Sequence, residues 1–405
     1  TLVVIAAWLV TIAYGSYRLG QTTSRNGPTV AVIQGSVPQF IKRKPTHYDA
    51  IDEEEFIMEQ YVPLTEEAIA SAETIDLIVW PETMVPGAIN RQFLRAGILR
   101  LVRDTSLAEH LFETQSRYRG YWREVKRLAD KSKANMLVGV ASIDFSGAHG
   151  IPVEDYGEEV PREKREVYII REGTRYNSAL LIKPDTPDYA YARRYDKVHL
   201  VLFGEYVPFR WWPGLYSLLQ RFTPYPFDYS LTPGKAGQKP FEQDGFRYNV
   251  PICYEGAMPM RIREMAMSGG EKQIDFLVNI SNDGWFVNPE WFPAWAPATE
   301  LDQHLNLYVF RAVENRLGIV RAVNTGISGF ITPSGAIDEI VRAPNGRRHN
   351  VGGYLVGRIQ VDSRVTFYSR YGDVFALLCF ATSVVLVIFT VGRHKKTQKR
   401  SQAKK

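Results

Sequence analysis

An uncharged apolar stretch near the end of the chain restricts the possible folds more than any other feature. The 18 residues 374–391 carry no charge, and the thirteen residues 393–405 include seven Lys or Arg, one His and no acid. With the flanking residues at 371–372, the stretch approaches the roughly 20 residues that a helix needs to cross a bilayer. The sequence therefore predicts a transmembrane helix at 371–392, because a buried core helix would not explain the basic tail.

Charge asymmetry predicts the orientation of this helix. Lys and Arg beside a span stay on the cytoplasmic side, so the basic tail at 393–405 is expected inside and the preceding chain on the periplasmic or exterior face. Residues 1–14 are also apolar, but they are short for a span and lack the charged start of a signal peptide. We interpret them as the C-terminal part of another transmembrane helix, followed by a polar linker at 15–28.

The remaining residues, 29–370, are expected to form one catalytic domain. With 405 residues that are 45% hydrophobic, the chain can bury a large core. Apolar strand-like runs alternate with helical stretches, which indicates an α/β fold. Nucleic acid is excluded as a partner, because the net charge is only +5 and no basic stripe interleaved with aromatic residues crosses this part.

Three reactive side chains follow apolar strand-like runs in this domain. Glu82 closes the run 77–81, Lys197 follows 189–195, and Cys253 follows 248–252. A thiol attacks a carbonyl well only as the thiolate, so a neighbouring base must take its proton. A fixed ammonium can then stabilise the oxyanion of the tetrahedral intermediate. The pattern predicts Cys253 as nucleophile, Glu82 as base and Lys197 as oxyanion partner in acyl transfer.

Each of these residues also has an ordinary structural interpretation. Cys253 could be a small buried hydrophobe, Glu82 a helix cap and Lys197 a solvated residue at a strand end. Their order and surroundings together favour catalysis. The sequence contains no Cys/His cluster with zinc spacing, no Walker loop and no dinucleotide fingerprint, so neither a metal nor a cofactor is expected. Cys253 and Cys379 lie in different segments and are not expected to pair.

The order Glu, Lys, Cys resembles the nitrilase, or carbon-nitrogen hydrolase, superfamily. Two strings, 197–209 and 252–255, look like signatures of its membrane-bound branch, the apolipoprotein N-acyltransferase family. The segments 32–39, 281–286 and 311–329 fit the same pattern. The resemblance extends over residues 29–362. It implies a nitrilase-like αββα sandwich with flanking transmembrane helix segments in a multi-pass protein of the bacterial inner membrane.

The resemblance also implies further site residues. Glu205 would lie beside the catalytic lysine, or would merely neutralise it. Tyr254 and Glu255 would line the pocket next to the thiol. Three more residues are expected to contact substrate or support those that do, although they could simply order a loop: Asn282, Asp283 and Trp285.

The implied reaction has two steps and needs no cofactor. Cys253 takes an acyl chain from a membrane phospholipid, and the α-amine of a diacylglyceryl-modified cysteine, at the N-terminus of a lipoprotein, then accepts it. Glu82 would transfer protons in both steps, and ping-pong kinetics should follow. Two alternatives remain open: a membrane-tethered amidase in which water resolves the acyl enzyme, and an inactive binding protein.

Several segments depart from the family pattern or extend it. Leu202 stands where the family usually has proline, and Arg43 lies where tryptophan is common. The polar segments 146–174 and 288–297 are interpreted as insertions near the substrate entrance. The aromatic segments 209–216 and 291–295 are expected to reach the lipid interface, where Trp and Tyr are favoured, or else to pack onto the core.

Overall fold

Two six-stranded sheets form the centre of the molecule. The computed structural model describes residues 2–21, 23–38, 47–94, 106–144, 174–223, 229–286 and 299–402. The strand order of the first sheet is β14 (Gly353–Val361), β1 (Arg25–Gln34), β2 (Leu77–Ala88), β3 (Asn135–Asp144), β4 (Thr174–Ile182), β5 (Arg193–Asp196). The order of the second is β13 (Ile337–Ile340), β12 (Gly329–Ile331), β11 (Gly318–Val323), β10 (Phe276–Ser281), β7 (Phe246–Asn249), β6 (Phe241–Gln243). A separate hairpin joins β8 (Met267–Ser268) to β9 (Glu271–Lys272).

The central strands are buried on both faces, and alternate side chains enter different parts of the core. In β2, Leu77 and Val79 belong to the apolar cluster between the sheets, whereas Ile78 and Trp80 pack in the cluster on the other face. This continuous apolar pattern is typical of parallel strands covered on both sides. Accordingly, β1, β2 and β3 are parallel neighbours, and so are β7, β10 and β11.

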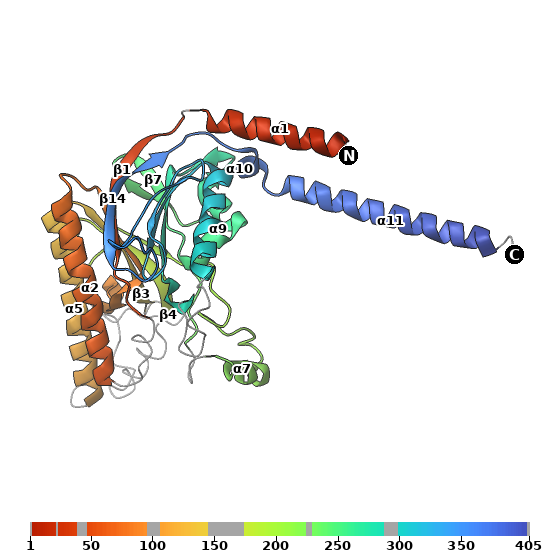
Figure 1. Cartoon of the computed structure of the whole chain (residues 1–405). Coiled ribbons are helices and arrows are strands. Elements are labelled where there is room, and N and C mark those ends of the chain that lie inside the picture. Colours follow the sequence, from red (N-terminus) through yellow and green to blue (C-terminus); the bar gives the residue numbers. More distant parts are fainter. Residues whose placement is uncertain are drawn as a thin grey trace.

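Helices cover the outer faces of the sheets, which confirms the expected α/β sandwich (Figure 1). The long helices α2 (His47–Ser71) and α5 (Ser106–Ser132) pack on the first sheet, and α8 (Pro259–Ala266) and α9 (Thr299–Asn315) lie over the second. The shorter elements are α3 (Arg91–Leu94), α7 (Pro213–Gln220), α10 (Phe367–Tyr371) and the 3-10 turns η3 (Cys253–Ala257) and η4 (Asp283–Phe286). The parallel strands direct their carboxyl ends to one edge of this sandwich.

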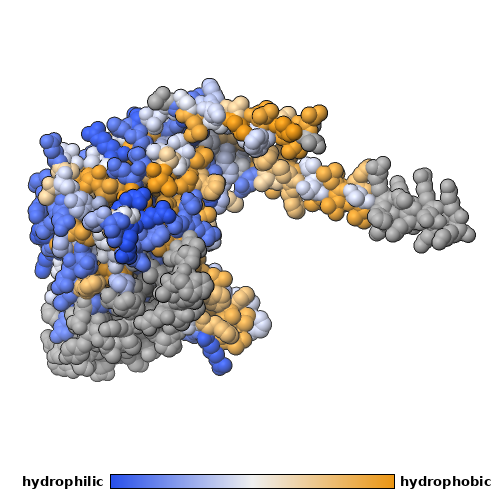
Figure 2. Space-filling model, viewed as in Figure 1, coloured by the Kyte–Doolittle hydropathy of each residue, from blue (hydrophilic) through white to orange (hydrophobic). Residues whose placement is uncertain are grey.

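Two terminal helices, α1 (Leu2–Leu19) and α11 (Val374–Gln402), project from the same side of the sandwich (Figure 1). Within α11, the 19 residues Val374–Gly392 are long and apolar enough to cross a membrane, and Val4–Leu19 is a shorter apolar helix. Both present apolar surface to the outside (Figure 2). The structure thus contains one helix, among the described residues, that meets the length and composition of a membrane span.

The element boundaries near the termini differ from the expected ones. Helix α1 continues to Leu19 and β1 begins at Arg25, so the polar connection is shorter than the linker expected at 15–28. The polar start of β1 is strand because Arg25 and Asn26 pair with the end of β14. At the other end, α11 extends into the basic tail as far as Gln402, beyond which the structure describes nothing.

Candidate active site

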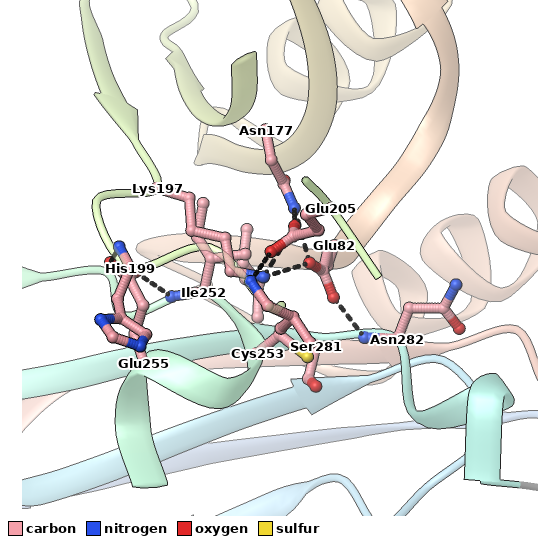
Figure 3. Close-up of polar contacts among 12 residues, drawn as sticks. Glu82, Asn177, Lys197, His199, Glu205, Ile252, Cys253, Glu255, Ser281 and Asn282 are labelled. Carbon is pink, nitrogen blue, oxygen red and sulfur yellow. Dashed lines mark hydrogen bonds and ion pairs between the residues drawn. The ribbon is translucent and has the colours of Figure 1, made fainter. Parts of the chain in front are cut away.

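The three predicted reactive residues meet at the carboxyl ends of the strands. Glu82 lies within β2, Lys197 directly follows β5, and Cys253 opens the turn η3 after β7. A parallel bridge between Ile252 and Ile280 holds the cysteine-bearing segment beside β10. Figure 3 shows the side chains of Glu82, Lys197 and Cys253 turned toward one another from the two sheets. Sequence reasoning had placed each of them at a strand end. Lys197 and Cys253 do follow strands, whereas β2 continues past Glu82 to Ala88, and only its pairing with β3 is interrupted there, between Trp80 and Val85.

Lys197 forms the charged centre of this group. Its Nζ lies 2.9 Å from Glu205 Oε1 and 3.2 Å from Glu82 Oε1, and the side chain is 1% exposed. Burial alone would lower the pKa of Lys197, but the negative charges of Glu82 and Glu205 outweigh it and raise that pKa above its ordinary value. The lysine is therefore a fixed ammonium at neutral pH, which is the state required to stabilise an oxyanion.

Asn177 joins the two carboxylates, and the sequence analysis missed it. Its Nδ2 donates to Glu82 Oε1 at 2.6 Å and to Glu205 Oε1 at 2.8 Å. The remaining oxygens accept backbone bonds, Glu82 Oε2 from Asn282 N at 2.9 Å and Glu205 Oε2 from Val201 N at 2.8 Å. Asn177 lies in the polar first half of β4, between Arg175 and Ser178, so its place in the sequence did not single it out. Its importance appears only from its burial, because buried polar groups need partners.

Cys253 adopts a conformation that non-glycine residues rarely take. Its φ is +51°, which places the residue in the left-handed region and marks local backbone strain. Tyr308 Oη donates to the Cys253 carbonyl oxygen at 2.8 Å and supports the turn. Burial raises the pKa of the thiol, the charge of Glu82 adds to this, and Lys197 opposes it. The resting thiol is therefore protonated and needs a base to react.

Glu255 lies behind the thiol, and it does not line the cavity as the sequence analysis expected. The carboxylate is fully buried and accepts backbone bonds from Val198, His199 and Ile252 at 2.8, 3.0 and 2.9 Å. Tyr195 Oη also donates to both carboxylate oxygens at 2.9 Å. Val198 and His199 directly follow Lys197, and Ile252 directly precedes Cys253. Glu255 therefore links the segment that carries the lysine to the turn that carries the cysteine (Figure 3).

Asp283 is likewise a buried support. It accepts hydrogen bonds from Ser281 Oγ at 2.6 Å and from an Arg321 guanidinium nitrogen at 2.7 Å, and its Oδ1 lies 3.0 Å from His304 Nδ1. Burial would raise the pKa of this carboxyl, but the charge of Arg321 holds it well below the usual range. Asp283 therefore anchors the loop that presents Asn282 to Glu82. The side chain of Trp285 lies outside the described residues.

The reactive groups open into a cavity of about 460 Å³. The predicted residues in its wall are Glu82, Lys197, Glu205, Cys253, Tyr254 and Asn282. The wall also includes the apolar residues Ala141, Val201, Leu202, Leu231 and Leu307 and the polar residues Thr83, Tyr176, Asn177, Glu300 and His304. Within the described residues, no group of three or more His, Cys, Asp or Glu could hold a metal ion. The arrangement combines a thiol, a carboxylate and an ammonium with room for an apolar chain.

The chain is similar in sequence to known proteins. A family model described as carbon-nitrogen hydrolase matches residues 29–353. The chain belongs to the carbon-nitrogen hydrolase family. Among solved structures, a carbon-nitrogen hydrolase from Helicobacter pylori G27 is 13% identical, with a TM-score of 0.48 over 82% of this chain and 88% of that one.

Two curated relatives of this chain carry the name apolipoprotein N-acyltransferase. The protein from Geobacter metallireducens is 30% identical over 389 residues, covering 95% of this chain and 58% of its own length. The protein from Caulobacter vibrioides is 27% identical over 401 residues, covering 96% of this chain and 60% of its own length. The chain thus spans about three fifths of the length of these relatives.

The raised pKa of Cys253 leads to a prediction about thiol reactivity. In a Cys379→Ser background, alkylation of Cys253 by iodoacetamide should keep accelerating from about pH 7 to about pH 10 without levelling off near 8.5, the ordinary thiol value. The reason is that burial and the Glu82 charge delay thiolate formation to higher pH. The unfolded protein is the control, and its rate should level off near that ordinary value. An alkylation rate that levels off below pH 8 in the folded protein would contradict a raised pKa of Cys253.

Proposed function

We propose that this chain is the catalytic part of a membrane-bound acyltransferase. It would transfer an acyl chain from a phospholipid, through a thioester at Cys253, to the N-terminal amine of diacylglyceryl-cysteine in an apolipoprotein. The observation that carries this proposal is the convergence of Glu82, Lys197 and Cys253 on an apolar-walled cavity. The relatives named apolipoprotein N-acyltransferase support the same reaction.

In the first step, Cys253 attacks the ester carbonyl of the phospholipid. Glu82 accepts the thiol proton as the sulfur–carbon bond forms, because the resting thiol is protonated. The ammonium of Lys197 stabilises the negative oxygen of the tetrahedral intermediate. Collapse of this intermediate breaks the ester bond, Glu82 returns the proton to the leaving alcohol, and a lysophospholipid departs. The acyl chain remains on Cys253 as a thioester.

In the second step, the free amine of the lipoprotein attacks this thioester. Glu82 takes a proton from the attacking nitrogen, and the departing sulfur recovers a proton as the amide forms. Glu205 and Asn177 hold Lys197 and Glu82 in place during both steps, since Glu205 contacts Lys197 and Asn177 contacts Glu82 and Glu205. An amide is more stable than a thioester, so no further energy source is required.

The surface near the cavity favours lipid substrates. The segment around α7 carries large exposed apolar side chains, with Trp211 78%, Phe222 76% and Trp212 55% exposed. Leu202 and Tyr254, both in the cavity wall, are also exposed, at 50% and 46%. The apolar patch over α7 is visible in Figure 2. These side chains do not pack onto the core, which agrees with the expected contact between 209–216 and the lipid interface.

Some predicted features near the entrance lie outside the described residues. They are Arg43, the aromatic segment 291–295, the insertion at 288–297 and all of the insertion at 146–174 except Thr174. The proposal therefore rests on the described cavity and on the exposed surface beside it.

An acceptor assay separates acyl transfer from hydrolysis. The purified protein is supplied with phospholipid and a diacylglyceryl-cysteine peptide, and the products are identified by mass spectrometry. We expect the peptide amide and an equal amount of lysophospholipid. Release of free fatty acid, together with turnover of a small soluble amide and no peptide amide, would favour the amidase alternative instead.

Close packing behind Glu82 gives a second structural prediction. A Cβ on Gly139 would lie 2.3 Å from the Pro81 carbonyl oxygen and 2.6 Å from the Glu82 Cα, and both of these are backbone atoms. Gly139→Ala must therefore shift β2 and displace the catalytic carboxylate, so we expect the rate of acyl transfer to fall by about 100-fold. Steady-state rates of peptide amide formation measure this loss.

The matched control is Gly120→Ala on α5, where an added Cβ meets no atom within 4 Å. That variant should keep full activity and gain about 0.5–1 kcal/mol of stability, because alanine favours the helix. Equal activity of the Gly139 and Gly120 variants would show that the position of β2 does not limit catalysis.

A further inference from the structure

A second cavity, of about 340 Å³, lies where α1 meets the sandwich. We call it the basic recess, and its charged wall consists of Arg18, Arg316, Arg364, Asp338 and Asp362. Arg18 belongs to the last turn of α1, while the other residues come from the ends of α9, β13 and β14. It shares no wall residue with the catalytic cavity.

The charges of the basic recess are not balanced. Asp362 is already engaged by Arg364, whose Nε lies 3.0 Å from both carboxylate oxygens and whose terminal nitrogen lies 2.6 Å from Oδ2. This pair is neutral as a unit. Arg18 and Arg316 then face only Asp338, which is exposed to solvent. The recess therefore carries an excess of positive charge.

Arg316 has the most buried side chain among the unpaired arginines of the recess. Its side chain is 8% exposed, and its Nε has no hydrogen-bond partner among the described residues. The Nε of Arg18 is buried without a partner as well. Burial lowers the pKa of Arg316, and the positive charges of Arg18 and Arg364 lower it further. A buried guanidinium N–H without an acceptor is costly, and a bound anion that accepts its hydrogen bond would remove that cost.

The position of the recess indicates which anion is available. Arg18 lies in the last turn of the apolar helix α1, whose side chains face outward, including Tyr14, Tyr17 and Leu19 at 61, 66 and 72% exposed. Tyrosines at a helix end favour the headgroup level of a bilayer, where phosphates lie. The planar guanidinium group of arginine can donate two parallel hydrogen bonds to phosphate oxygens and carries the opposite charge. Leu19 is part of the wall of the recess, so the recess lies beside the end of α1 that is expected at the headgroup level.

We infer that the basic recess binds the phosphate of an anionic phospholipid headgroup. The single negative charge of the phosphate offsets the excess positive charge of the recess. By contacting both Arg18 and Arg316, the phosphate ties α1 to the catalytic domain. This inference depends on the membrane placement in the proposed function, but not on the acyl-transfer reaction. The bound lipid is a structural ligand, since the wall of the recess contains no thiol that could take an acyl chain from an ester.

Native mass spectrometry of the full chain in detergent micelles tests the inference with phosphatidylglycerol as the probe. All proteins carry Cys253→Ala, so that every added lipid mass is non-covalent. Arg18→Gln and Arg316→Gln should each weaken the binding of one lipid about fivefold, the effect of one basic residue near a membrane surface. Asp338→Asn should strengthen it. Lipid held in the catalytic cavity is the same in all variants.

Two controls complete the design. Arg347→Gln removes an exposed arginine outside the recess and should leave lipid binding unchanged. Inorganic phosphate, added in place of lipid, should bind more weakly, because it gains nothing from the adjoining α1 surface. If Arg316→Gln unfolds the protein, as thermal unfolding would reveal, Arg18→Gln and Asp338→Asn still decide the question.

Unchanged lipid affinity in both Arg18→Gln and Asp338→Asn would overturn the inference. So would inorganic phosphate binding as tightly as the lipid. Acylation of Cys253 is measured separately in the unsubstituted protein, and its absence would contradict the proposed reaction without affecting the lipid site.

Discussion

Cys253→Ser should abolish formation of the lipoprotein amide while the protein remains folded. A serine hydroxyl is far less acidic than a thiol, and Glu82 next to it is too weak a base to activate it, so we expect a loss of about 10⁴-fold or more. The substitution keeps the size of the side chain, and the support from Tyr308 is made to the backbone carbonyl. Stability should therefore change by less than about 1 kcal/mol. Peptide amide formation and thermal unfolding measure the two effects.

The second cysteine provides the matched control for this variant. Cys379 is exposed on α11 and lies outside the catalytic cavity, so Cys379→Ser should retain full activity. Substantial amide formation by the Cys253 variant, or its loss in the Cys379 variant, would remove Cys253 from the role of nucleophile.

Glu82→Gln should have the second largest effect, a loss of about 10³-fold in acyl-enzyme formation. Glutamine can still accept the backbone bond from Asn282, but it cannot take the thiol proton. The variant also removes the negative charge that raises the pKa of Cys253. Its thiol should therefore alkylate faster than the wild-type thiol at the same pH, although it no longer takes an acyl chain. Single-turnover acylation and alkylation rates separate these two effects.

Glu205→Gln distinguishes the base from the neighbouring acid. Both carboxylates contact Lys197 and Asn177, so the two variants disturb the same network. Only Glu82 is assigned the proton transfer, and the loss in Glu205→Gln should therefore be at least about tenfold smaller. A larger loss in Glu205→Gln than in Glu82→Gln would indicate that Glu205, and not Glu82, transfers the proton.

The reactive residues were predictable because each has a local signal. Glu82, Lys197 and Cys253 follow apolar runs, and an α/β fold places such strand ends at one edge of its sheets. Asn177 has no comparable signal, because its importance arises only when β4 lies beside β3 and Glu205 folds back over it. The long apolar helix near the end of the described chain was predictable from composition alone, since its length and apolar character depend on a single segment.

Side-chain direction was harder to predict than position. Tyr254 and Glu255 are adjacent in the sequence, yet the first lines the cavity and the second points into the core. The turn η3 produces this split, because the positive φ of Cys253 reverses the chain at the nucleophile. The connection between α1 and β1 is shorter than expected for a similar reason. The polar residues at the start of β1 pair with β14 and therefore belong to a strand. Such effects depend on partners that are remote in the sequence.

The most direct test of the account is the intact mass of the protein after incubation with phospholipid and no acceptor. Without the amine, the thioester should accumulate, so the protein gains the mass of one acyl chain at Cys253. Adding the diacylglyceryl-cysteine peptide should remove that mass and yield the peptide amide. If the wild-type protein gains no acyl mass while still forming the amide, or if the mass appears on Cys253→Ala, the thioester mechanism is wrong.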